Sequence, residues 1–113
     1  MEAGGLIVNI TDVGAHKVWT SYPAYVVSKS ALETLTRLLA RSCAPQIRVN
    51  AIALGLALPS EAITPEAWEA LVKRTPLKRA VSTDEITAAL EFLLKNESIT
   101  GQTIVVDGGY SLV

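Results

Sequence analysis

The sequence has one cysteine, one histidine and no excess of charge. Cys43 is its single cysteine, so no disulfide can form within the chain, which agrees with a reducing compartment. His16 is its single histidine, and no further ligand residues stand around it at metal-binding spacing, so we predict no metal site. A formal net charge of −1 with dispersed basic residues excludes the basic footprint of a nucleic-acid-binding protein.

Long apolar runs are also missing. No run approaches the ~20 residues that a membrane-spanning helix needs. The N-terminal stretch MEAGGLIVNI is acidic, and its apolar part is too short for a secretory signal. We therefore expect a cytoplasmic protein that does not enter a membrane. Half of the 113 residues are hydrophobic, which predicts one domain, residues 1–113, with a real core.

The first half of the sequence predicts a β-α-β unit. Residues 6–10, LIVNI, are β-branched and apolar as in a strand buried on both faces. Residues 11–23 form a loop, and apolar residues then recur at helical spacing over 24–44, before Pro45. A second strand follows at 47–53. Two strands joined through a helix should be parallel, with a right-handed crossover.

The second half adds two helices and a third strand. Thr64 and Pro65 predict the start of a short helix, and Ser82 with Glu85 forms a capping-box signature for the next one. Residues 103–109 predict a strand and a glycine turn. The fold class is therefore α/β: half of an open, doubly wound parallel sheet of three strands with flanking helices. The first strand lacks a neighbour, and an open apolar edge is a hazard, so we expect a missing upstream part.

Tyr25 and Lys29 lie four positions apart on the predicted helix and so share one of its faces. A cation near a phenol lowers its pKa, which would make Tyr25 a better proton relay at neutral pH. The same spacing also arises by chance in many helices. From the pair alone, a catalytic role and an ordinary polar surface both remain possible.

Four motifs together resemble the C-terminal half of a short-chain dehydrogenase/reductase: GLIVNIT, YVVSKSALETLTRLLA, IRVNAIALG and ITGQTIVVDGG. The resemblance covers nearly the whole chain and implies a Rossmann-type fold. It implies that Tyr25 gives or takes a proton while hydride passes to or from a nicotinamide, and that Lys29 holds the nicotinamide ribose and lowers the pKa of Tyr25. Family members commonly pair through the tyrosine-bearing helix, which implies a homo-oligomer through residues 24–44.

Asp12 departs from the family pattern, which usually has serine thirteen residues before the tyrosine. The pteridine reductases of the family carry aspartate there, and the segments AITPEAWEALVKRTPLKR and DGGYSL also resemble theirs. This resemblance implies reduction of a pteridine C=N bond, with Asp12 and Tyr25 on the substrate. Other or lost substrate chemistry, including carbonyl–alcohol chemistry, and a purely structural Asx-type turn at Asp12 remain open. Trp68 is either a wall of the substrate pocket or part of a helix-packing face.

The cofactor implied by the resemblance is NADPH. The implied contacts, in the family's manner, are Thr11, Tyr25, Lys29, Gly55, Leu56 and Ala57. In the loop ALGLA, Leu54 replaces the family's usual proline.

The glycine-rich dinucleotide fingerprint is missing, because Gly4 and Gly5 precede a strand rather than follow one. We therefore expect the dinucleotide-binding N-terminal half on a longer polypeptide or a companion chain, and an isolated 113-residue chain without activity. The alternative is a truncated, non-catalytic remnant that at most associates with itself or a relative.

Overall fold

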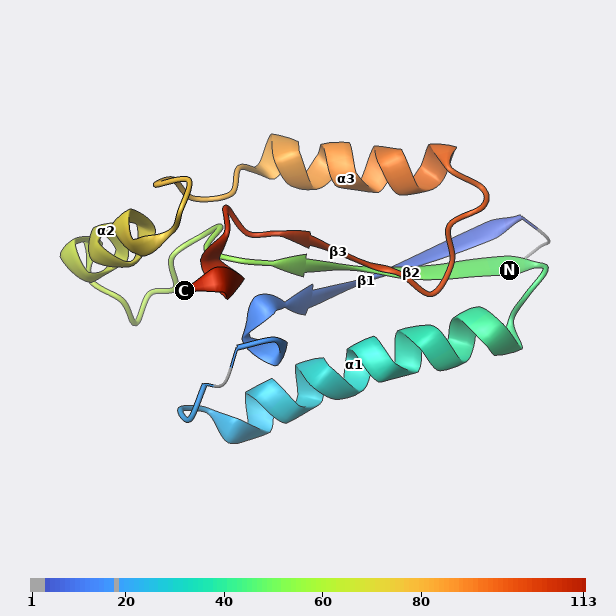
Figure 1. Ribbon diagram of the computed structural model, residues 1–113, viewed down its shortest axis with the longest axis horizontal. Helices are drawn as coiled ribbons and strands as arrows, with labels where there is room; N and C mark the ends of the chain where they lie inside the picture. Colours follow the sequence, from blue (N-terminus) through green and yellow to red (C-terminus); the bar gives the residue numbers. More distant parts are fainter. Residues whose placement is uncertain (1–3, 18) are drawn as a thin grey trace.

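A three-stranded parallel sheet forms the centre of the molecule (Figure 1). The computed structural model describes residues 4–17 and 19–113. The strands are β1 (Gly5–Asp12), β2 (Ile47–Leu54) and β3 (Thr103–Val106), and they lie side by side in that order. Both neighbouring pairs are parallel, which confirms the predicted β-α-β unit.

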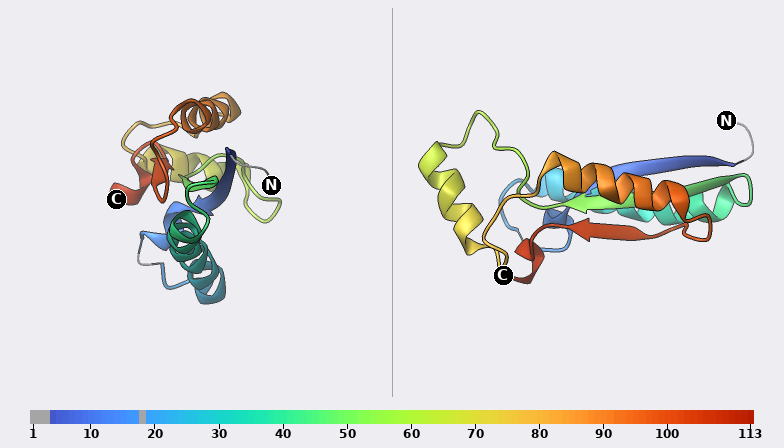
Figure 2. Two further views of the ribbon diagram at one scale, coloured as in Figure 1. Left: turned by 90° about the vertical axis from the view of Figure 1, so that its right-hand side faces the viewer. Right: turned by 90° about the horizontal axis from the view of Figure 1, so that it is seen from above.

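Helices cover both faces of the sheet. Helix α1 (Pro23–Ser42) lies on one face and α3 (Thr83–Lys95) on the other, as the two perpendicular views agree (Figures 1 and 2). β2 runs between them and is the most deeply buried strand. Its fully buried side chains are Val49, Asn50, Ala51, Ile52 and Ala53. The predicted α/β fold of Rossmann type is confirmed.

Helix α1 begins and ends near prolines, as the sequence predicts. Pro23 occupies the first helical position, where its missing N–H leaves no hydrogen bond unmade. The residue before it, Tyr22, has φ 55° and ψ 54°, in the left-handed region that bulky side chains seldom adopt. The chain thus enters α1 through a sharp turn. The helix ends at Ser42, three residues before Pro45.

Helices α2 (Pro65–Arg74) and α3 start at the predicted caps. The Thr64 hydroxyl accepts a hydrogen bond from the Ala67 N–H at 3.2 Å. Ser82 and Glu85 make both hydrogen bonds of a capping box. Figure 2 shows α2 beyond the ends of the strands, and every residue of α2 keeps some contact with solvent.

The first strand is longer than the apolar run LIVNI predicts. β1 continues through Thr11 and Asp12 because β2 offers pairing partners as far as Leu54, opposite Asp12. A single turn of 3-10 helix, η1 (Val13–Ala15), follows at once. Val13 is fully buried, so the segment expected to be a loop is anchored in the core.

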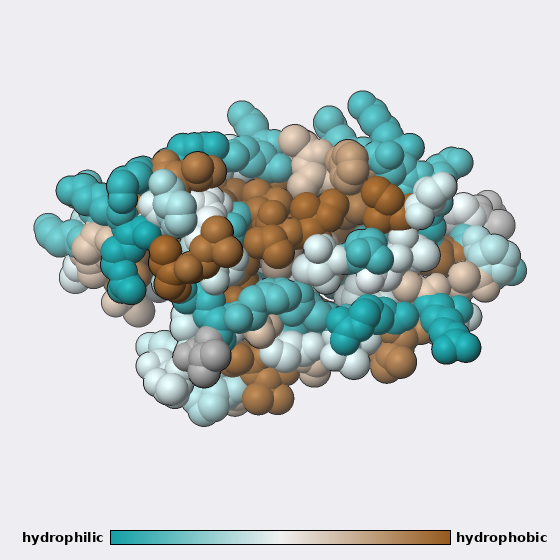
Figure 3. Space-filling model, viewed as in Figure 1, coloured by the Kyte–Doolittle hydropathy of each residue, from teal (hydrophilic) through white to brown (hydrophobic). Residues whose placement is uncertain are grey.

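Both edges of the sheet are partly open to solvent. Ile10 on β1 is 41% exposed and Val105 on β3 is 44% exposed. Figure 3 shows apolar side chains gathered in a band along the middle of one face, below the α3 layer.

Of the helices that the structure describes, none is both long and apolar enough to cross a membrane.

Candidate active site

The carboxyl ends of the three parallel strands meet at one edge of the sheet, where α/β proteins bind their ligands. Asp12 ends β1 opposite Leu54, which ends β2. Gly55 and Asp107 follow β2 and β3 and pack against each other. A Cβ at Gly55 would stand 2.6 Å from the Cβ of Asp107, so glycine is required there for packing between the two strand ends.

Asp12 uses its two carboxylate oxygens for different partners. Its Oδ1 accepts a hydrogen bond from the Gly14 N–H at 2.7 Å and so caps η1. Its Oδ2 accepts a hydrogen bond from the Tyr25 hydroxyl at 3.0 Å. The turn expected of a structural aspartate and the contact expected of a catalytic one are therefore present in the same side chain.

The pKa of Tyr25 is raised, whereas the resemblance implied that Lys29 lowers it. Burial of the phenol raises this pKa most, followed by the hydrogen bond to Asp12 and the negative charge of Asp12. The Lys29 ammonium lies 5.7 Å from the centre of the Tyr25 ring and hydrogen-bonds the Ile10 carbonyl at 3.5 Å. The anion is thus the dominant charged neighbour of the hydroxyl, and Tyr25 is held as a protonated phenol.

The residues implied to contact the cofactor differ in their exposure to solvent. Lys29 is half-exposed at the site, and an ammonium has three N–H donors, so it retains hydrogen-bonding capacity for a ribose. Thr11 lies on the same side of β1 as Asn9, which hydrogen-bonds Thr36 of α1 at 2.9 Å. Thr11 is only 3% exposed, and its hydroxyl has no hydrogen-bond partner among the described residues.

The loop after β2 is held in place by packing and by a backbone hydrogen bond. Leu56 packs against the buried cluster of Val13, Ala53 and Tyr110, and its carbonyl accepts a hydrogen bond from the Val81 N–H at 2.8 Å. Ala57 is half-buried. Lys29 and the strand ends suit the nicotinamide end of a dinucleotide. The described part of the chain has no glycine-rich turn between a strand and a helix for its pyrophosphate.

An aromatic hollow of about 510 Å³ lies beside the start of α1. The Trp19 and Tyr110 rings form part of its wall, with their centres 6.3 Å apart and their planes inclined by 59°. Lys17 Nζ lies 4.3 Å from the centre of the Tyr110 ring. The complete lining is Trp19, Thr20, Ser21, Tyr22, Leu71 and Tyr110.

No motif in the sequence indicates this hollow, because its walls come from three segments far apart in the chain. Tyr22 stands one helical turn before Tyr25, so the hollow adjoins the catalytic candidates. Trp68, the sequence-based candidate for a pocket wall, is half-buried on α2. Among the described residues, α2 contributes Leu71 to the lining of the hollow, one turn after Trp68.

The comparisons with known proteins agree with this geometry. A family model described as enoyl-(acyl carrier protein) reductase matches residues 1–111. The parallel α/β sheet and this match together define the class of protein to which the chain belongs. The chain belongs to the short-chain dehydrogenase/reductase family, and within it is close to the pteridine reductases.

Two curated relatives represent two substrate types. The chain is 41% identical over 114 residues to carbonyl reductase family member 4 of Danio rerio, covering 100% of this chain and 48% of that protein. It is 34% identical over 111 residues to dihydromonapterin reductase of Enterobacter sp. strain 638, covering 98% of this chain and 46% of that protein. The chain thus spans about half the length of these relatives.

Solved structures match the fold closely. FolM alternative dihydrofolate reductase 1 from Brucella canis, complexed with NADP, superposes with a TM-score of 0.94 at 45% identity, covering 98% of this chain and 44% of that one. A small-chain dehydrogenase in complex with NADPH gives a TM-score of 0.87 at 30% identity, covering 100% of this chain and 54% of that one.

Proposed function

We propose that this chain is the C-terminal catalytic half of an NADPH-dependent reductase that acts on the C=N bond of a reduced pteridine. The observation that carries the proposal is the 3.0 Å hydrogen bond from the Tyr25 hydroxyl to Asp12. The family usually has serine at the position of Asp12. A carboxylate beside the phenol therefore distinguishes this site from the usual site of the family. The similarity to a dihydromonapterin reductase and to a FolM dihydrofolate reductase supports the same substrate class.

The proton in this reaction comes from Tyr25. Reduction of a C=N bond adds hydride to carbon and a proton to nitrogen, and hydride is the chemistry that NADPH supplies when bound. A phenol with the ordinary pKa of 10.0 is protonated at neutral pH, and burial and Asp12 raise the pKa of Tyr25 further, so its hydroxyl carries the proton that a general acid must donate. Lys29 would hold the nicotinamide ribose. Asp12 orients the phenol and presents an acceptor to the N–H groups of a pterin ring.

Substitution of Tyr25 by Phe tests the assignment. In the complete protein, Tyr25→Phe should lower kcat for a dihydropterin at least ~100-fold, the low end of the effect of general acid–base catalysis. The measurement is the loss of NADPH absorbance on addition of substrate. Tyr22→Phe, which removes a hydroxyl from the adjoining hollow but leaves the proton donor, serves as the matched control. Turnover near that of the wild type in Tyr25→Phe would refute the role.

Carbonyl reduction is the second candidate, favoured by the 41% identity to the Danio rerio carbonyl reductase family member. The two functions separate in a direct competition between a dihydropterin and a panel of aldehydes and ketones. A higher kcat/KM for the dihydropterin supports the proposal. A preference for the carbonyl compounds would replace it, with Asp12 then acting chiefly as the cap of η1.

The dinucleotide-binding half would be supplied from outside these residues, on the same polypeptide or a companion chain, and the partner site would be the open edge of β1. The intact mass of the natively produced protein, with any chain that co-purifies, tests this arrangement. A species well above 12.0 kDa or a co-purifying chain with a glycine-rich βαβ unit supports it. A lone 12.0 kDa chain would favour a non-catalytic remnant instead.

The unpaired Cys43 suits the cytoplasm that we propose as its location.

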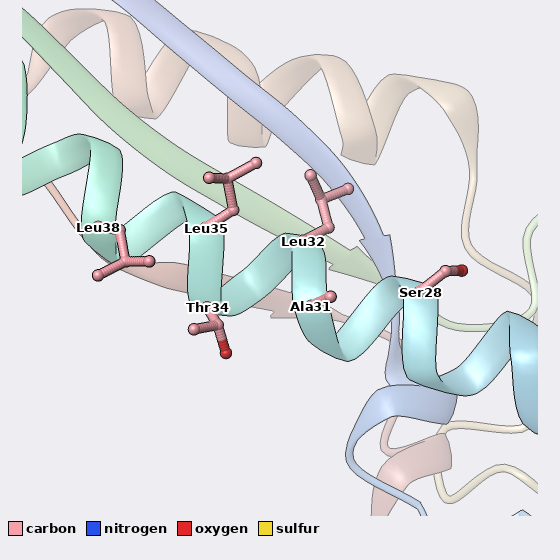
Figure 4. A pocket seen from close by; sticks show the side chains of 6 residues that line it. All are labelled: Ser28, Ala31, Leu32, Thr34, Leu35 and Leu38. Atoms are coloured by element: carbon pink, nitrogen blue, oxygen red, sulfur yellow. The ribbon is translucent and has the colours of Figure 1, made fainter.

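A homo-oligomer through α1 belongs to the same proposal. α1 has a shallow apolar hollow of about 560 Å³ on its surface, and Leu35 and Leu38 beside it are 44% and 62% exposed. Figure 4 shows that the lining side chains all come from α1, with the short Ala31 between longer ones. A second copy of the same helix would present matching leucines to this gap, as an isologous interface requires.

A further inference from the structure

The short helix η1 is attached to α1 at both of its ends. At the start of η1, its N-cap Asp12 accepts the hydrogen bond from Tyr25. The other end of η1 has His16 as its C-cap. The Nε2 atom of His16 lies 2.8 Å from Oε1 of Glu33. Tyr25 and Glu33 are both on α1, eight residues apart, which corresponds to about 12 Å along the helix axis. One rigid helix therefore holds both ends of the segment that carries Asp12.

The Glu33 carboxylate depends on His16 for a hydrogen bond, because the Glu33 side chain is nearly buried. The Glu33 side chain is 10% exposed and that of His16 is 42% exposed. A buried carboxylate without a partner is strongly destabilising, and the hydrogen-bond partner that the described residues offer Glu33 is His16. An imidazole can donate an N–H from Nε2 in its protonated form or in one neutral tautomer, so the contact can persist across neutral pH.

We propose that His16 and Glu33 are positioning residues that hold the Asp12 carboxylate in hydrogen-bonding reach of Tyr25. The fully buried Val13 fixes one point of η1 in the core, and a single point leaves the segment free to turn about it. The attachment of His16 to Glu33 supplies a second fixed point. The consequence for catalysis rests on the proposed function, whereas the geometric consequence does not.

The first experiment measures the geometry without substrate. The titration of Tyr25 is followed by NMR of ring-labelled tyrosine in the full-length native protein, with the signal assigned through Tyr25→Phe. In His16→Ala, the hydrogen bond to Asp12 should loosen, and the pKa of Tyr25 should move down toward its ordinary value. His16→Gln retains an N–H donor near the Nε2 position and should restore the wild-type titration.

The matched control is Arg79→Ala. Arg79 and Glu85 form an ion pair of the same length, 2.8 Å, on the surface away from η1, so its loss should leave the titration of Tyr25 unchanged. A folded His16→Ala variant whose Tyr25 titrates as in the wild type would overturn the positioning role. If His16→Ala does not fold, the double variant His16→Leu with Glu33→Leu takes its place, because it leaves no unpaired buried charge; the same downward shift is expected, and its absence overturns the proposal.

The second experiment measures the catalytic consequence. His16→Ala should lower kcat for the dihydropterin roughly tenfold, within the range of coupling between contacting residues, while KM stays near its wild-type value. The loss should vanish when Asp12 is already Ala, because no side-chain acceptor then remains to be positioned. Equal losses in both backgrounds would show a merely structural effect and overturn the proposal. A shifted Tyr25 titration in a protein without any reductase activity would instead sustain the positioning role and refute the proposed function.

Discussion

Asp12 gives Tyr25 a different task from that of a tyrosine activated by lysine alone. A phenol that donates its hydrogen to a carboxylate is stabilised in its protonated form. The Lys29 ammonium lies beside the Tyr25 ring rather than at its hydroxyl. The carboxylate of Asp12, rather than the ammonium, is therefore the charged group that reaches the hydroxyl.

The raised pKa of Tyr25 has a consequence for stability at alkaline pH. A group whose pKa is higher in the folded state contributes stability that is complete below its ordinary value of 10.0 and is lost as the pH rises through the folded-state value. Wild-type protein and Tyr25→Phe should therefore differ in thermal stability near neutral pH, with the difference shrinking above pH 10.0. Melting curves at a series of pH values measure this. A difference that stays constant through the alkaline range would contradict the raised pKa.

Asp12→Ser separates the two contacts of Asp12. Serine is as good an N-cap as aspartate, so the free energy of unfolding should change by less than about 1 kcal/mol, as measured by denaturant titration. Dihydropterin reduction should fall roughly tenfold or more, the equivalent of one hydrogen bond to a charged group. Asp12→Ala, which loses the cap as well, is the comparison for stability. Undiminished pterin reduction in Asp12→Ser would leave Asp12 a structural residue.

At the scale of the element, α3 owes its first turn to a charged cap. The hydrogen bond from Arg79 lowers the pKa of Glu85 to about 2, assisted by the hydrogen bonds from Ser82. A lowered pKa contributes stability that is complete above the ordinary value of 4.5 and is lost as the pH falls toward about 2. Both effects act at the start of a helix, where a negative charge is also favoured by the helix dipole.

Glu85→Gln should remove that dependence on pH. Glutamine can still complete a capping box but does not ionise, so wild type and variant should differ most above about pH 4.5 and converge toward about pH 2. Thermal melts across this range make the comparison. Glu91→Gln, on the same helix and with no ion pair among the described residues, should parallel the wild type. A gap between Glu85→Gln and the wild type that persists at the lowest pH would contradict the assignment.

The elements could be predicted because their signals are local. Thr64 caps α2 and Ser82 with Glu85 caps α3, each where the sequence places it, and α1 begins at Pro23, one residue before its predicted start. The one clear misplacement was the end of β1, which the sequence put at residue 10. Pairing with β2 and burial of Val13 extend the ordered chain into the expected loop, and neither effect shows in the hydropathy of the segment itself.

The site could be predicted only in part, because much of it depends on contacts between distant segments. Tyr25, Lys29 and Asp12 were found through motif spacing, and the structure brings Tyr25 and Asp12 into contact. The contact of His16 with Glu33 joins residues that no motif relates. The direction of the shift in the Tyr25 pKa depends first on burial of the phenol and then on the contact with Asp12, and sequence spacing to Lys29 reports neither.

At the scale of the whole molecule, the described chain is more extended than its length requires. Its radius of gyration is 15.2 Å and its extents are 47 × 29 × 24 Å, whereas a compact domain of this length has a radius of about 13 Å. Parallel sheets are almost always covered on both faces and continued at their edges. The open edge at β1 and the exposed leucines of α1 are the surfaces that further structure would cover.

A charge on α1 should break the proposed oligomer. Leu38→Glu places a carboxylate at one end of the apolar hollow of α1, where a second copy would bury it, and the protein should shift to half its native mass. Sedimentation equilibrium or light scattering measures this. Leu94→Glu on α3 is the matched control, because Leu94 is 60% exposed and Leu38 is 62% exposed. Equal masses for Leu38→Glu and the wild type would exclude the α1 interface.

The two contacts of Asp12 also limit how this site can evolve. One side chain both stabilises η1 and accepts the hydrogen bond of the Tyr25 hydroxyl, so under the proposed function most exchanges at this position would reduce the fraction of folded protein and the rate together. Serine, threonine and asparagine keep the cap and alter only the chemistry. A laboratory selection for new substrates should therefore recover these three residues at position 12 first. A change from aspartate to serine or back would move a protein between substrate classes in a single step without passing through an unstable intermediate.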